Sequence, residues 1–157
     1  MAIDIGSPAV GRGSTLAATY TLILKENPAN ESGTITTIEI YARTNITGCI
    51  VGTFYLTNGT TLKCRANVAI GNVDAGEKRV FTPVSLAVVA GDFIGIYFDT
   101  GTIERDTSGY AGLWYIDEEH IDPNDEANYS SMPGDTLSLW GESAVAVVGR
   151  SFGFIMG

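Results

Sequence analysis

Apolar and polar residues alternate with a period of two along most of the chain, and this pattern predicts β-strands. Residues 16–24 alternate with an apolar even-numbered face, and Ile38, Ile40 and Ala42 repeat the pattern in a second strand. Successive side chains of a strand point to opposite faces of a sheet, so each alternating segment predicts one buried face. Apolar residues at the i, i+3, i+4 spacing of a helix are nearly absent. The chain is therefore expected to be all-β.

The dipeptide Asn58-Gly59 predicts a two-residue hairpin turn of type I′, with positive φ at both residues. In that register Cys49 and Cys64 share a face but lie about 13 Å apart along the strands. A disulfide needs Cα atoms within about 7 Å, so two free, buried thiols are expected rather than a bridge. The predicted core face of this hairpin carries Cys49, Val51, Tyr55, Leu62, Cys64, Ala66 and Val68.

The later part of the chain predicts more short strands. A continuous apolar run over 93–99 follows the tight turn Ala90-Gly91-Asp92 and is typical of a strand covered on both faces. Turn signals recur roughly every 8–12 residues, which favours a sandwich or barrel. Residues 117–133 lack a β pattern and predict an acidic loop with room for one helical turn. We expect a single antiparallel β-sandwich domain over 1–157, with extended segments at 1–13 and 143–157.

The acidic charge balance excludes several classes of partner. The formal net charge is −9, which would repel nucleic-acid phosphates and anionic lipid headgroups. The longest apolar runs, Val84–Ala90 and Ala144–Val148, are far shorter than the ~20 residues of a membrane span. The N-terminus lacks the charged and apolar regions of a signal peptide. No nucleic-acid or membrane partner is expected, and no secretory leader.

The acidic loop is the one candidate for a metal site. Calcium prefers several oxygen ligands, and the candidate carboxylates are Asp117, Glu118, Glu119, Asp122, Asp125 and Glu126, with Asp99, Glu104 and Asp106 if the loops converge. Their spacing matches no recognised calcium loop. A solvated acidic surface, and no metal, is the expectation.

Catalytic constellations are no better supported. Glu104 and Asp106 would share a strand face and resemble a glycosidase pair only in residue type. His120 is the only histidine, and no nucleophile motif accompanies it. We predict no enzyme, no catalytic residue and no cofactor.

Aromatic side chains in the C-terminal half could stack on a sugar ring or pack in the core, and packing is the favoured interpretation. They are Tyr97, Phe98, Tyr110, Trp114, Tyr115 and Trp140. Four glycosylation sequons, headed by Asn30, Asn45, Asn58 and Asn128, carry little weight in a chain so rich in Ser and Thr.

Two segments carry a resemblance to known proteins. The run LAVVAGDFIGIYF (Leu86–Phe98) looks like the later strands of small jelly-roll modules, which include the C1q/TNF-like group and accessory β-domains of tailed-phage virion proteins. The run GTIERDTSGYAGLWY (Gly101–Tyr115) is similar to phage structural modules. The resemblance implies a jelly-roll-like structural protein of the virion that forms trimers or binds a lattice, such as a capsid decoration protein or a fibre domain.

Such a protein would be made in the host cytoplasm and would decorate or cement a capsid, with the major capsid protein as its partner. The alternative is a carbohydrate-binding module of a phage fibre or an extracellular protein.

The C-terminal segment is apolar and holds one charge, Arg150. An exposed apolar strand would pair with other chains. We therefore expect residues 143–157 to dock on a neighbouring subunit of a homo-oligomer; the alternative is an ordinary final strand of the sandwich.

Overall fold

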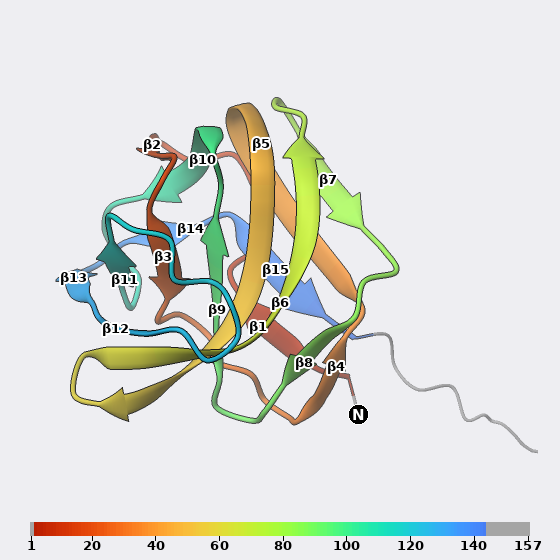
Figure 1. Ribbon diagram of the computed structural model, residues 1–157. Helices are drawn as coiled ribbons and strands as arrows, with labels where there is room; N and C mark the ends of the chain where they lie inside the picture. Colours follow the sequence, from red (N-terminus) through yellow and green to blue (C-terminus); the bar gives the residue numbers. More distant parts are fainter. Residues whose placement is uncertain (1, 144–157) are drawn as a thin grey trace, which may run out of the picture.

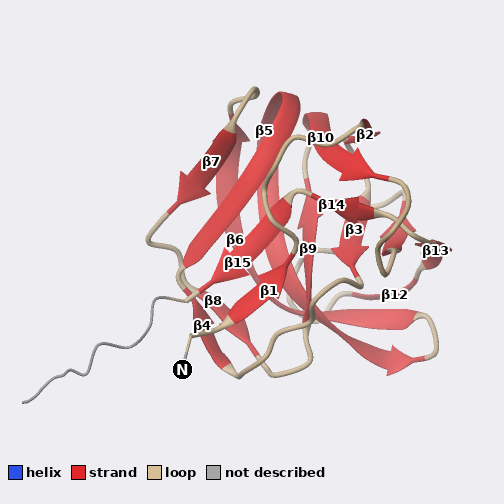
Figure 2. Ribbon diagram, turned by 180° about the vertical axis from the view of Figure 1, so that it is seen from behind, coloured by secondary structure: helices blue, strands red, loops and turns tan. Residues whose placement is uncertain are grey.

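The computed structural model describes residues 2–143, and this part of the chain consists of strands and loops without a helix (Figures 1 and 2). All of its strand pairs are antiparallel. The predicted all-β, antiparallel β-sandwich is confirmed. The helical turn considered for 117–133 is absent; two short strands lie there instead.

The strands are β1 (Asp4–Gly6), β2 (Ser14–Ala17), β3 (Thr21–Leu24), β4 (Gly33–Ile35), β5 (Thr37–Asn58), β6 (Thr61–Val73), β7 (Lys78–Phe81), β8 (Leu86–Val88), β9 (Phe93–Tyr97), β10 (Thr100–Asp106), β11 (Leu113–Ile116), β12 (Glu126–Asn128), β13 (Ser130–Met132), β14 (Thr136–Leu137) and β15 (Leu139–Glu142).

One long strand, β5, organises the sandwich. Its N-terminal part pairs with β15 and β7, its middle with β10, and its C-terminal part with β6 and β9. Figure 1 shows β5 curving through the molecule, as the twist of a long strand requires. We call β1, β15, the start of β5 and β7 the first sheet. The second sheet consists of β12, β6, the end of β5, β9, β3, β11 and β13.

The main core lies between the two sheets. Ile38 and Ile40 enter it from the first sheet, and Leu22, Leu24 and Ile96 from the second; all five are fully buried. The predicted buried face of the strand holding Ile38 and Ile40 is confirmed. The main core is the larger of two apolar clusters.

A second core covers the opposite face of the second sheet. It contains Ile23, Phe54, Leu62, Cys64, Trp114, Ile121 and Tyr129. The strand predicted over 16–24 with only an even buried face is therefore wrong in two respects. It is interrupted around Thr19, which has a φ of 71°, and Ile23 is as buried as its neighbours because β3 is covered on both faces.

The β5–β6 hairpin has a different register from the predicted one. Asn58 pairs with Thr61, and neither Asn58 nor Gly59 has a positive φ, so the type I′ turn is wrong. Register shifts along β5 place Cys49 in the main core and Cys64 in the second core. Both thiols are free, as predicted. They lie on opposite faces of the sheet, whereas the prediction placed them on the same face at a distance along the strands.

The apolar run that begins at Phe93 is covered on both faces, as predicted. Ile94 and Ile96 are buried in the main core, while Phe93 and Tyr97 pack against the second core. The turn before it is made by Gly91, whose φ is 91°. At the N-terminal end, β1 pairs with β15. The C-terminal docking segment lies outside the described residues from 144 onward.

Candidate functional site

The acidic loop 117–125 covers the second core (Figure 1). Ile121, at the middle of the loop, is fully buried. Its carbonyl accepts a hydrogen bond of 2.8 Å from the Asn67 side chain on β6. Backbone hydrogen bonds between Cys64 and the loop, from its amide to the Asp125 carbonyl and from the Asn124 amide to its carbonyl, tie the loop to the same strand. The loop is thus a packed wall of the domain.

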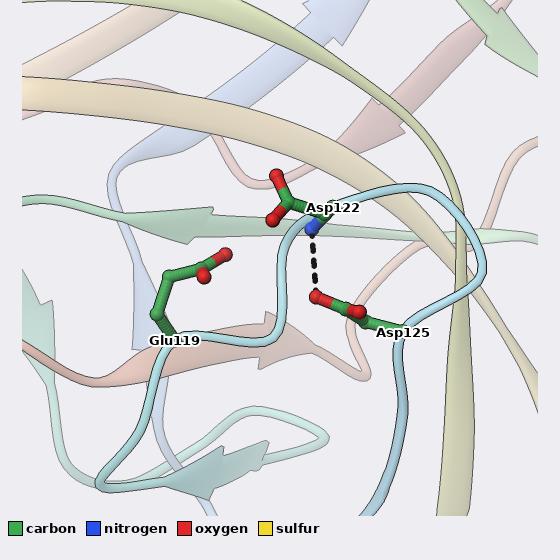
Figure 3. Close-up of side chains that lie close together, drawn as sticks. All are labelled: Glu119, Asp122 and Asp125. Carbon is green, nitrogen blue, oxygen red and sulfur yellow. Dashed lines mark hydrogen bonds between the residues drawn. The ribbon is translucent and has the colours of Figure 1, made fainter.

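Three of the predicted calcium ligands come together on this loop (Figure 3). One carboxylate oxygen each of Glu119, Asp122 and Asp125 lies within 4.8 Å of the others. Two of the carboxylates also accept loop amides: Glu119 from the Ile121 amide at 2.8 Å, and Asp125 from the Asp122 amide at 3.2 Å. The cluster closes turns of the loop. At one oxygen from each of its three side chains, it offers fewer ligands than the six to eight that calcium takes.

The other predicted ligands lie elsewhere. Glu126 accepts a hydrogen bond from Thr57, Glu118 contacts His120, and Asp99 lies against Gly48. Among the described residues, only Glu119, Asp122 and Asp125 come close enough to share an ion, so the loops do not converge on one larger site.

The thiol beside the acidic cluster is inert. Burial raises the pKa of Cys64 to about 12, and the nearby carboxylates of Asp125, Asp122 and Glu119 add to the rise. Burial also raises the pKa of Cys49. The thiolate is the nucleophile and the metal ligand, so neither cysteine provides that chemistry near neutral pH.

Glu104 and Asp106 share one face of β10, as predicted, but they form ion pairs with arginines. The Glu104 carboxylate is 2% exposed and accepts hydrogen bonds from the Arg43 guanidinium and, at 2.5 Å, from the Arg12 amide. Asp106 accepts one from Arg12 Nη1 at 2.7 Å. These bonds lower the pKa of both carboxyl groups. A glycosidase acid needs a raised pKa, so the pair is suited to holding the chain and not to donating a proton.

His120 lies on the acidic loop with its Nε2 atom 2.6 Å from Glu118 Oε1. Its backbone amide donates to the Thr21 hydroxyl. Among the described residues, no serine, threonine or cysteine side chain bonds the imidazole ring. The histidine therefore has an acidic neighbour without the nucleophile that a triad would add.

The predicted aromatic residues are divided among several parts of the domain. Phe98 is fully buried in the main core, and Trp114 packs edge-on against Phe93 in the second core, with ring centroids 4.8 Å apart. Tyr110 lies beside the Arg12 guanidinium. Trp140 is on β15, at the outer face of the first sheet. Stacking on one shared ligand is not possible for a set so divided.

The sequon asparagines mostly have structural contacts. The Asn30 side chain bonds the Asp4 amide and the Ala2 carbonyl. Asn45 accepts from the Ala75 amide, and Asn128 from the Thr60 hydroxyl.

Sequence reasoning missed the ion pairs that link distant strands. Arg65 on β6 bonds both carboxylate oxygens of Asp92, at 2.6 and 3.0 Å, and Asp92 is 2% exposed. Arg105 on β10 bonds the buried carboxylate of Asp135 at 3.3 Å. The only signal was the low number of basic residues in an acidic chain, and it does not say which partners meet.

No protein-family model matches the chain, and no curated protein matches it in sequence. Residues 2–143 include no helix long and apolar enough to cross a membrane. No pocket is found on this part of the chain.

Proposed function

We propose that this chain is a non-enzymatic structural protein of a virion, and specifically a decoration or cement protein on the outer surface of a phage capsid. The observation that carries the proposal is the use of the buried carboxylates. Glu104, Asp92 and Asp135 are each paired with an arginine from a distant part of the chain. The groups that could perform chemistry hold the sandwich together instead.

Such internal pairing suits a protein whose role is mechanical. A buried carboxylate left without its arginine is strongly destabilising, so the pairs fix one arrangement of the strands. The two cores on either side of the second sheet add to the same rigidity. The acidic surface, with a net charge of −9, favours a component that stays dispersed until it meets its binding site.

The likeness of residues 86–98 and 101–115 to jelly-roll modules of phage particles gives the proposal its setting. On this proposal the partner is the major capsid protein, and a trimer is the favoured assembling form. The carbohydrate-binding alternative would need exposed aromatics on one face. It has weaker support, because Phe98 and Trp114 are buried in different cores.

Virions purified by density gradient from cells that encode the chain would test the proposal. An antibody against the recombinant protein should label the particle surface in immunogold electron microscopy. Particles made without the chain should recover the label when the recombinant protein is added. A chain that stays in the unbound fraction and never binds such particles would show the proposal to be wrong. Label on the tail would move the role from capsid to tail.

A further inference from the structure

The outer face of the first sheet carries two apolar side chains, Trp140 and Val80, that the described residues leave at least partly exposed. Val80 on β7 is 50% exposed. Cross-strand pairing puts Trp140, Glu39 and Val80 in one row, since Trp140 is opposite Glu39 and Glu39 is opposite Val80. Residues directly opposite in a sheet have Cβ atoms about 5 Å apart. Trp140 and Val80 thus flank a single carboxylate.

A third exposed apolar residue, Val10, lies beside this row. Ser138 comes directly before β15, and its hydroxyl donates to the carbonyl of Val10 at 2.5 Å. Val10 is 45% exposed. On the other side of Trp140, its partner in β1 is Gly6. We call Val10, Trp140, Glu39 and Val80 the row patch.

The charges around the row patch are mainly negative. Glu39 stands at its centre, and Glu142 accepts a hydrogen bond of 2.7 Å from the Trp140 indole N–H. Lys78 is the nearby cation, with its Nζ atom 3.7 Å from Glu39 and half of its side chain exposed. The chemistry of the row patch therefore suits a ligand that is apolar along its length and carries one positive charge.

Residues 144–157 of this chain have that composition. They include Val145, Val147, Val148, Phe152 and Ile155, and their one charge is Arg150. The segment follows Ser143, whose amide bonds the Ile3 carbonyl at the end of the first sheet. Fourteen residues span up to about 46 Å when extended, which is enough to reach another copy.

We propose that residues 144–157 of one copy bind the row patch of a second copy, with Arg150 at Glu39. β15 runs from Trp140 toward Ser143, so the chain leaves the row patch as it enters this segment. Binding its own row patch would need an immediate reversal, and binding a second copy needs none. This exchange of C-terminal segments between copies does not depend on a role in a virion.

Two other uses of this surface are less well supported. The outer edge of β7 could add a strand, but Lys78 and Pro83 are typical protectors of an edge. A glycan could bond the carboxylates of Glu39 and Glu142 beside Trp140, but Val10 and Val80 offer it no hydrogen bond. An apolar segment with one arginine matches all four residues of the row patch.

Sedimentation velocity of the full chain over a range of concentrations tests the exchange. The wild type should associate, and Val80→Glu should raise the dissociation constant at least about tenfold, because a carboxylate would be buried in an apolar contact beside Glu39. Leu56→Glu is the matched control. Leu56 is 44% exposed on the hairpin that projects away from the first sheet (Figure 1), and this variant should associate like the wild type.

A charge exchange tests the assignment of Arg150. Arg150→Glu alone should weaken association, and Arg150→Glu combined with Glu39→Arg should restore it. Circular dichroism confirms that each variant is folded. A monomeric wild type, an equal effect of Leu56→Glu and Val80→Glu, or a double variant weaker than Arg150→Glu would each overturn the proposal. So would a monomer whose Trp140 fluorescence responds to glycans, which would make the row patch a carbohydrate site.

Discussion

The two apolar cores of this domain are built in different ways. The main core has a sheet on each side, and its residues come from strands that alternate regularly. The second core has a sheet on one side only, and its other wall is the acidic loop with Ile121 at its centre and Tyr129 between β12 and β13. A loop that covers a core can shift inward when side-chain atoms are removed. A sheet resists such a shift because interstrand hydrogen bonds hold its strands in place. The two cores should therefore respond differently to the loss of similar side chains.

Phe98→Ala should produce the largest effect on stability. Phe98 is fully buried between the sheets, and such truncations cost about 3–5 kcal/mol. That is a large part of the 5–15 kcal/mol of a typical domain. Urea unfolding followed by circular dichroism and by tryptophan fluorescence should give one shared transition at a lower midpoint. A midpoint within the error of the wild type would contradict the role of the main core.

Ile121→Ala should have a smaller and more local effect. Truncation of a buried isoleucine costs about 2–5 kcal/mol, and the value here should lie near 2–3 because the loop can partly fill the space. Trp114, which packs in the same core, should become more accessible to acrylamide quenching before the domain unfolds. Val89→Ala, at a site 41% exposed, is the control. A loss as large as that of Phe98→Ala would show that the two cores are one unit.

This difference also explains how far the sequence could be used. Alternation predicted the burial of Ile38 and Ile40, and the continuous apolar run predicted two covered faces for β9. Alternation did not predict the burial of Ile23 and Phe54, because the period of a strand shows which residues share a face but not whether a distant loop covers that face. The burial of Ile121 was not predicted either, because its neighbours in the sequence are acidic. The carboxylates of the acidic loop could be named from the sequence, but the arginine partners of Asp92 and Glu104 depend on the fold.

Acid should weaken the β10 ion pairs, which link β10 to Arg43 on β5 and to Arg12 in the N-terminal segment. Bonding to Arg43 lowers the pKa of Glu104, and bonding to Arg12 lowers that of Asp106. A lowered pKa means that these groups stabilise the fold above their ordinary values of about 4, and that this stability is lost as the pH falls through the lowered values. The melting temperature should therefore stay level toward pH 5 and drop in stronger acid.

Glu104→Gln should lower the melting temperature at neutral pH and flatten its fall in acid. Glu77→Gln, which changes a carboxylate that is 67% exposed, is the matched control and should follow the wild type. Parallel curves for wild type and Glu104→Gln would show that other groups control the acid response.

Substitution at the tip of the β5–β6 hairpin should change little. Gly59 has no atom within 4 Å of an added Cβ and no positive φ, so Gly59→Val should alter stability by no more than about 0.5 kcal/mol. Gly101→Ala is the contrast, because Gly101 has a φ of 99° and its Cβ would lie 2.2 Å from the Asn45 carbonyl oxygen. Equal losses in urea unfolding would mean that the tip has the strained turn first predicted for it.

Removal of calcium should have the smallest effect, and it tests what holds the wall of the second core. The loop is attached by the burial of Ile121 and by backbone bonds to Cys64, and two of its three clustered carboxylates already accept loop amides. An ion that binds only the folded state raises its stability by linkage. Melting temperatures in chelator and in excess calcium should therefore coincide. A rise of several degrees with calcium that Asp122→Asn abolishes would show that a metal, and not the apolar contact of Ile121, closes this core.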